Sequence, residues 1–273
     1  MALRRDRDAA RLTQEQVAGS MDWSLSKVIR IEAGTVSIST NDLRALLRLY
    51  AVQDDAEVRE LLELARAARK RGWWTAYRDA VPGGFLDFIG LESDATVHRY
   101  FQSLVVPGVL QTKEYARIVI ATTMPTDPDE DQLKTLVEIR LKRQENILEC
   151  PDPPELFVVL DESVIHRVAG SRQIMRAQLI HLVDCARRPG ITIRVLPFAA
   201  GHHPVMARAS VVLEFPDEGD DPVLYVEDAF AGEILDRPQD MGIYYRAFEK
   251  LDRMALDPQK SITLITEVAD GFA

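Results

Sequence analysis

Two helix starts lie unusually close together near the beginning of the sequence. Thr13 is followed three residues later by Gln16, the pair of residue types that forms a capping box at a helix start. Ser24 provides a second cap soon afterwards, and Gly34 supplies the residue that ends a helix in the left-handed conformation. The spacing predicts two short helices, over 14–21 and 25–33, joined by a tight turn at Asp22, Trp23 and Ser24.

The rest of the first 72 residues also has helical periodicity. Residues 3–11 are polar and helix-prone, residues 40–50 place Leu43, Leu46, Leu47 and Tyr50 on one face, and residues 55–71 repeat the pattern. We therefore expect an all-α N-terminal domain over residues 1–72. The last helix ends in a basic cluster, which we interpret as a solvated helix end in preference to a second DNA contact: Arg66, Arg69, Lys70 and Arg71.

Residues 73–84 are expected to link this domain to a larger one. Pro82-Gly83-Gly84 is typical of a hinge, while Trp73, Trp74 and Tyr77 form an aromatic group that we interpret as core between the domains and not as a ligand wall. Residues 85–149 are predicted to be helical, with helices over 85–99, 112–121 and 129–148.

The sequence pattern changes from helical periodicity to short β-rich runs after the helix-breaking segment Cys150-Pro-Asp-Pro-Pro. Residues 155–273 are predicted to be α+β, with strands at 156–160, 191–196, 210–215 and 223–227 and a helix at 171–186. The overall prediction is an α+β protein in which an all-α N-terminal domain precedes a mixed helical and α+β C-terminal domain over 85–273. The helix at 129–148 is amphipathic and can pack on the body of the protein or on a partner.

Charge is distributed unevenly along the 273 residues. Residues 1–52 carry eight Lys or Arg against six Asp or Glu, whereas the whole chain has a net charge of −10. An acidic body disfavours nonspecific contact with a polyanion, so any nucleic-acid binding is expected from a local N-terminal surface. The sequence offers neither a membrane-spanning run nor a signal peptide, which predicts a cytoplasmic protein, and Cys150 and Cys185 are expected to be reduced thiols.

The spacing of the two capped helices matches that of a DNA-binding helix-turn-helix, in which the second helix presents side chains to the major groove. Apolar residues fix the angle between the helices: Val17, Ala18, Met21, Val28 and Ile31. This arrangement predicts that Ser26, Lys27 and Arg30 point outward. Double-stranded operator DNA is therefore the expected ligand.

The segments Leu12-Thr13-Gln14-Glu15-Gln16-Val17-Ala18 and Ser26-Lys27-Val28-Ile29-Arg30-Ile31-Glu32-Ala33-Gly34 resemble the Cro- and repressor-like (XRE) class of helix-turn-helix proteins. The resemblance implies that Gln14 and Ser24 contact the DNA backbone and that Leu25, Ser26 and Arg30 face the bases. It also implies a structural ion pair between Arg7 and Glu32. A guanidinium can bind guanine through two hydrogen bonds, so Arg30 is the preferred base reader, and Lys27 is assigned to phosphate.

The remainder of the chain has its own family resemblance. Motifs in fixed order, among them Leu91-Glu92-Ser93-Asp94-Ala95, Val105-Val106-Pro107-Gly108-Val109-Leu110-Gln111-Thr112 and Val195-Leu196-Pro197-Phe198, are similar to a large actinobacterial family of regulators with a C-terminal domain of unassigned biochemical function. The resemblance implies an antitoxin-like transcriptional regulator with a small acidic protein partner. A homodimer is expected because a single recognition helix buries too little surface for specificity.

The alternative is that the C-terminal domain is a metal-dependent or hydrolytic enzyme. Its candidate residues are Asp161, Glu162, His166, His181, His202, His203 and Asp228. Their spacing matches no catalytic motif, and Asp161-Glu162 before a helix is equally what helix capping requires. We therefore expect neither enzymatic activity nor a cofactor. Val106-Pro107-Gly108 with Gln111 and Thr112 is interpreted as a turn and helix cap in preference to a pocket rim.

Overall fold

The computed structural model describes residues 2–34, 38, 40–52, 54–69, 72–124, 126–203, 208–215, 222–226, 232–235 and 238–273. Up to residue 69 these residues form helices: α1 (Ala2–Ala9), α2 (Gln14–Met21), α3 (Leu25–Ala33), α4 (Thr40–Leu49) and α5 (Asp55–Arg69). One apolar cluster holds them together: Val17, Ala18, Val28, Ile31, Ile38, Leu43, Leu46, Leu47, Tyr50, Leu61, Leu62 and Ala65. The prediction of an all-helical N-terminal region is confirmed.

A short 3-10 helix, η1 (Trp73–Tyr77), and α6 (Gly83–Asp94) follow. The rings of Trp73 and Trp74 meet edge to face with their centres 6.1 Å apart, yet every residue of η1 keeps some exposure to solvent. The Tyr77 hydroxyl donates a 2.7 Å hydrogen bond to Glu138 of the C-terminal region. These aromatic residues are therefore only half-buried, and the prediction that they form a core between the domains is wrong. Gly83 begins α6.

The C-terminal region is built on a mixed sheet with strand order β3-β2-β1-β4-β5-β6. Its strands are β1 (Val97–Gln102), β2 (Glu155–Asp161), β3 (Ile191–Leu196), β4 (Ser210–Glu214), β5 (Val223–Val226) and β6 (Glu233–Leu235). β1, β2 and β3 are parallel, with Tyr100 opposite Val158 and Val158 opposite Ile193. β4, β5 and β6 continue the sheet in antiparallel fashion.

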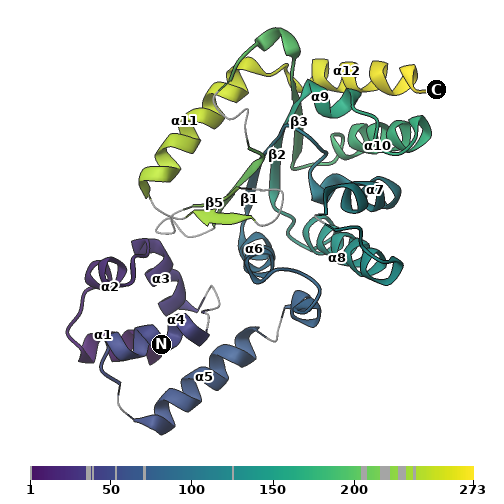
Figure 1. The fold of residues 1–273 in the computed structure, drawn as a ribbon. Helices are drawn as coiled ribbons and strands as arrows, with labels where there is room; N and C mark the ends of the chain where they lie inside the picture. Colours follow the sequence, from purple (N-terminus) through teal and green to yellow (C-terminus); the bar gives the residue numbers. More distant parts are fainter. Residues whose placement is uncertain are drawn as a thin grey trace.

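Helices cover both faces of this sheet (Figure 1). The connections between parallel strands carry η2 (Gly108–Leu110), α7 (Lys113–Thr123), α8 (Glu130–Leu148), α9 (Glu162–His166) and α10 (Arg172–Cys185). The short 3-10 helix η3 (Phe198–Ala200) follows β3, and the chain ends with α11 (Pro238–Met254) and α12 (Pro258–Gly271). Side chains alternate along the strands, so that Tyr100 and Val158 join the core under α7, α10 and α12, while Phe101 and Val159 join the core under α11.

The amphipathic helix α8 packs within the body of the protein, on α7 and η2. Its buried apolar side chains include Leu133, Val137, Ile147 and Leu148. Of the two alternatives that the sequence left open for this amphipathic face, packing on the body of the protein is the one found.

Two parts of the sequence prediction are wrong. Residues 97–99 were assigned to a helix and the whole of 85–149 to helical structure, but β1 lies there, at the centre of the sheet. The strand was missed because His98 and Gln102 interrupt its apolar pattern, although both side chains are buried. The helices α11 and α12 and the short strand β6 were not predicted. The α+β fold class is confirmed.

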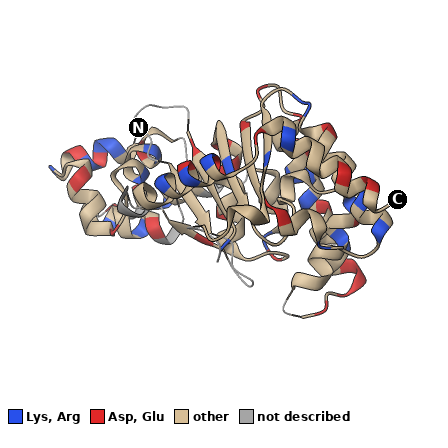
Figure 2. Ribbon diagram, turned by 90° about the horizontal axis from the view of Figure 1, so that it is seen from above, with Lys and Arg blue, Asp and Glu red and all other residues tan. Residues whose placement is uncertain are grey.

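Charged residues of both signs are interspersed along the helices at both ends of the molecule (Figure 2). In the part of the chain that the structure describes, no helix is long and apolar enough to cross a membrane. Cys150 and Cys185 are free thiols that form no disulfide bond, as predicted, and Cys185 is buried. Lys70 and Arg71 of the basic cluster lie outside the described residues, as does Asp228.

Candidate nucleic-acid interface

The caps that defined α2 and α3 in the sequence are formed in the structure. The Thr13 hydroxyl accepts a 3.2 Å hydrogen bond from the Gln16 amide, and the Gln16 side chain accepts a 2.8 Å hydrogen bond from the Thr13 amide. Ser24 Oγ accepts a 3.1 Å hydrogen bond from the Lys27 amide. Gly34 ends α3 with a φ of 75°, in the left-handed region. The two predicted helices and their capping residues are therefore confirmed.

Asp22 makes the turn between these helices possible. It adopts a φ of 55° and a ψ of 42°, the left-handed conformation that aspartate tolerates better than most residues. Its amide donates to the carbonyl oxygen of Ala18 and closes α2. Two residues later Ser24 is already in extended conformation as the cap of α3. The geometry is that of a helix-turn-helix.

Glu32, near the end of α3, connects this helix to α1 and α2 through hydrogen bonds. Its carboxylate accepts a 2.6 Å hydrogen bond from Arg7 Nε of α1 and a 2.9 Å hydrogen bond from Gln14 of α2. The Tyr50 hydroxyl lies 3.5 Å from the same carboxylate. The hydrogen bond to Glu32 raises the pKa of Arg7 against the effect of burial, and burial together with the charge of Glu32 raises the pKa of Tyr50.

The ion pair between Arg7 and Glu32 implied by the family resemblance is thus present. The contact between Gln14 and Glu32 was not expected, because Gln14 was assigned to the DNA backbone. The contribution of Tyr50 was also missed, because its place on the apolar face of the helix predicted over residues 40–50 explained the residue without a polar role.

The expected outward orientation of the α3 side chains is wrong for two of the three residues. Ser26 is 1% exposed and Arg30 is 2% exposed, although both lie on the helix assigned to the major groove. The carbon at the centre of the Arg30 guanidinium lies 4.4 Å from the centre of the Phe215 ring, directly after β4. The physical reason for the burial of Arg30 is a long-range contact with the C-terminal region that no local sequence pattern reveals.

Lys27 keeps a partly exposed side chain. Its ammonium group lies 4.3 Å from the centre of the Trp23 ring and 4.0 Å from a carboxylate oxygen of Asp42. Both contacts are weak and accessible to solvent, so the ammonium is available to a phosphate. Trp23, in the turn, was not predicted to contribute to this surface.

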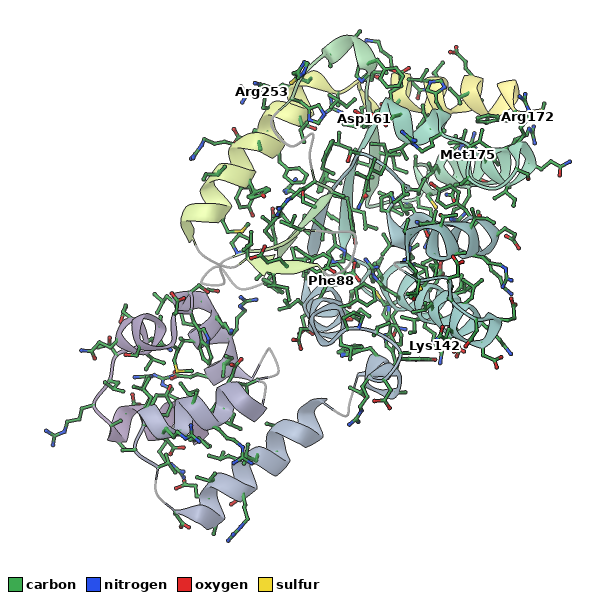
Figure 3. All side chains as sticks on the ribbon, viewed as in Figure 1. Phe88, Lys142, Asp161, Arg172, Met175 and Arg253 are labelled. Atoms are coloured by element: carbon green, nitrogen blue, oxygen red, sulfur yellow. The ribbon has the colours of Figure 1, made fainter. Side chains whose placement is uncertain are left out.

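The polar residues considered for catalysis mostly serve local structure. Asp161 caps α9 by accepting a 2.9 Å hydrogen bond from the Ser163 amide, as the capping interpretation predicted. Glu162 accepts a 2.6 Å hydrogen bond from the Phe198 amide and lies 3.3 Å from His166. Asp161 lies at the end of the sheet opposite to Phe88 and the N-terminal helices (Figure 3).

The candidate histidines have different surroundings. His203 Nε2 lies 3.9 Å from Asp161, whereas His181 contacts Cys185 on α10 and His202 is exposed. Burial lowers the pKa of both His203 and His181. Within the described ranges, no group of three or more His, Cys, Asp or Glu side chains has an arrangement suited to a metal ion.

A buried ionic network, which was not predicted, lies under the motif at residues 91–95. Glu92 accepts hydrogen bonds from the guanidinium of Arg143 on α8 and a 2.6 Å hydrogen bond from the Tyr100 hydroxyl on β1. Burial is the largest single influence and raises the pKa of Glu92. Arg143, His98 and Tyr100 together lower it by more, and the net pKa lies below the ordinary value. The network joins α6, β1 and α8.

The neighbouring motif at residues 105–112 forms a turn and a cap. The Gln111 side chain donates a 2.7 Å hydrogen bond to the Val106 carbonyl oxygen, and Thr112 caps α7 by accepting from the Tyr115 amide. The prediction of a turn and helix cap over this segment is confirmed.

Two family models match the chain. One, described as a helix-turn-helix domain, covers residues 1–61. The other, described as a domain of unknown function (DUF5753), covers residues 85–267. No curated protein and no solved structure matches the chain. The first match covers the capped helices α2 and α3, and the second covers the whole sheet.

Proposed function

The chain belongs to the family defined by the DUF5753 domain, and because a helix-turn-helix domain precedes that domain, we propose that it is a sequence-specific DNA-binding transcriptional regulator. The observation that carries the proposal is the geometry of α2 and α3: two capped helices separated by a left-handed turn and fixed to α1 through Glu32. This is the geometry that places the second helix in a major groove.

The two basic residues of α3 are assigned different tasks. Arg30 reads a base pair, since its guanidinium can donate two hydrogen bonds to guanine, and Lys27 binds phosphate. Gln14 and Ser24 contact the DNA backbone, and Leu25 faces the bases; Ser26 is buried and is not assigned to them. Base reading by Arg30 requires that its side chain leaves Phe215.

The test is the affinity of the full chain for operator and for random DNA over a salt series. Arg30→Ala is expected to cost about 1–3 kcal/mol on the operator and to relax preference at one base pair. Lys27→Ala is expected to weaken binding to all sequences similarly and to reduce the salt slope by about one phosphate contact. Equal losses on both DNAs for Arg30→Ala contradict the assignment.

We further propose that the regulator is a cytoplasmic homodimer that binds paired half-sites. The half-sites are expected about 34 Å apart, one turn of the double helix. Footprinting of the operator measures this spacing, and protection of a single unrepeated half-site would contradict the dimer.

The C-terminal domain is proposed to bind a small acidic protein or a ligand and not to catalyse a reaction. The family resemblance supports this antitoxin-like arrangement. The helix cap formed by Asp161 and the hydrogen bond of Glu162 with the Phe198 amide account for both carboxylates without chemistry. Elemental analysis of the purified, folded protein is the direct test. A stoichiometric metal ion would favour the metal-dependent alternative.

A further inference from the structure

Arg30 is enclosed by the C-terminal region. Its guanidinium stacks on the ring of Phe215, which follows β4, and its charge acts on Asp94, the last residue of α6. Loss of solvent around the Asp94 carboxyl group raises its pKa to about 6, while the positive charge of Arg30 acts in the opposite direction. Two separate elements of the C-terminal region therefore act on one side chain of α3, Phe215 by direct contact and Asp94 through its charge.

This position is incompatible with reading a base. Recognition of guanine requires the edge of the guanidinium to face the O6 and N7 atoms in the major groove. At 2% exposure, Arg30 has almost no surface left for a base pair. Entry of α3 into a groove therefore requires that Phe215 and α3 separate.

The connection between the two regions is compatible with such a separation. The chain passes from α5 to α6 through residues 70–82, and the described part of this segment contains the half-buried 3-10 helix η1 (Figure 1). The apolar core of α1–α5 and the cores that flank the sheet are separate clusters. Moving one region away from the other therefore leaves each core intact.

We propose that the structure is a closed state in which the C-terminal region blocks the recognition helix by seating Phe215 on Arg30. The proposal rests on the proposed function, because only a DNA-reading Arg30 makes the contact inhibitory. A partner that binds the C-terminal region better in the open state shifts the population toward DNA binding. Regulation then acts through one cation–π contact and one charge interaction across the two regions.

The first experiment measures the affinity of the full chain for its operator after Phe215→Ala. Loss of a cation–π contact of ordinary strength is expected to raise the affinity about 2- to 30-fold. The matched control is Phe157→Ala, which removes a similar ring, 4.6 Å from Arg99, inside the C-terminal region. Phe157→Ala is expected to leave DNA affinity unchanged.

Asp94→Lys provides a second variant, since Phe215 also packs on the core and its removal can disturb the fold. The new positive charge repels Arg30 and is expected to raise operator affinity. Any added positive charge strengthens DNA binding through the phosphates, so a control for charge alone is needed. The control is Asp184→Lys, which makes the same charge change at an exposed position on α10. At equal salt concentration, Asp94→Lys is expected to raise operator affinity more than Asp184→Lys does.

Small-angle scattering without DNA separates failure of the closed state from failure of the proposed function. Phe215→Ala is expected to have a larger radius of gyration than Phe157→Ala. Selective DNA binding of equal strength in the wild type, Phe215→Ala and Asp94→Lys would overturn the closed state. An increase in the radius of gyration without selective binding to any DNA would overturn the proposed function instead.

Discussion

At the scale of single residues, Glu32 determines how the recognition helix is held. One buried carboxylate joins α3 to α1 through Arg7 and to α2 through Gln14. Removing one partner of a buried ion pair leaves the other charge uncompensated, and this loss is larger than the net strength of the intact pair. Glu32 therefore links the stability of the N-terminal region to the orientation of α3.

We predict that Glu32→Gln lowers the free energy of unfolding of the N-terminal region by about 3–5 kcal/mol. The variant keeps the size of the side chain but leaves the buried Arg7 guanidinium with the exposed carboxylate of Asp8 as its counter-charge in place of buried Glu32. Urea unfolding followed by circular dichroism measures the effect. Glu60→Gln, at an exposed position on α5, is the control and is expected to change little. Wild-type stability in Glu32→Gln would show that Arg7 finds other partners.

At the scale of secondary-structure elements, the boundaries of α2 and α3 depend on local capping. Thr13 and Gln16 satisfy two amide groups at the start of α2 that no other helical residue can satisfy. This dependence on neighbours in the sequence is the reason that both helices could be predicted to the residue.

Thr13→Ala is expected to destabilise the N-terminal region by about 0.5–2 kcal/mol, because the first turn of α2 loses its side-chain acceptor. Thr13→Ser retains the hydroxyl and is expected to restore most of the loss. Thermal unfolding of the two variants checks the prediction. If Thr13→Ser were as unstable as Thr13→Ala, the methyl group and not the hydrogen bond would be responsible.

The C-terminal elements were harder to predict because their polar residues are satisfied by distant partners. His98 interrupts the apolar pattern of β1, but its ring lies 3.0 Å from the Glu92 carbonyl oxygen on α6. The contact of Arg30 with Phe215 spans most of the chain and likewise has no local signal. Caps, turns and amphipathic faces could be read from the sequence, whereas burial of polar residues by remote segments could not.

The Glu92 network provides a pH-dependent prediction at this scale. Its net pKa is lower in the folded protein than the ordinary value, so ionised Glu92 stabilises the fold. This stabilisation is fully present above the pKa of Glu92 in the unfolded chain and is lost as the pH falls through the lower folded-state pKa.

Glu92→Gln is expected to cost about 3–5 kcal/mol at neutral pH, because Arg143 is left buried without its counter-charge. The difference between wild type and variant should shrink as the pH falls through the range below pH 4. Urea unfolding over a pH series measures it. Glu130→Gln, which breaks an exposed pair with Arg117, is the control and is expected to have little effect. A difference independent of pH would contradict the role of ionised Glu92.

At the scale of the whole molecule, the two regions are stabilised by separate sets of contacts. The buried apolar side chains of α1–α5 form one cluster, and those on the two faces of the sheet form others. The contact of Arg30 with Phe215 crosses between regions but is a single cation–π interaction, small compared with the burial in either core. Each region is therefore expected to unfold largely on its own.

Calorimetry of the full chain is predicted to show two unfolding transitions, each sensitive to a different variant. Glu32→Gln should lower only the transition of the N-terminal region, by about 4–8 °C for each kcal/mol, and Glu92→Gln only that of the larger region, by about 2–4 °C for each kcal/mol. Each variant is the control for the other, because distant sites without shared partners contribute independently. A single transition lowered by both variants would mean that the regions unfold as one cooperative unit. Separating the C-terminal region from the recognition helix would then cost far more free energy than the loss of the Arg30–Phe215 contact.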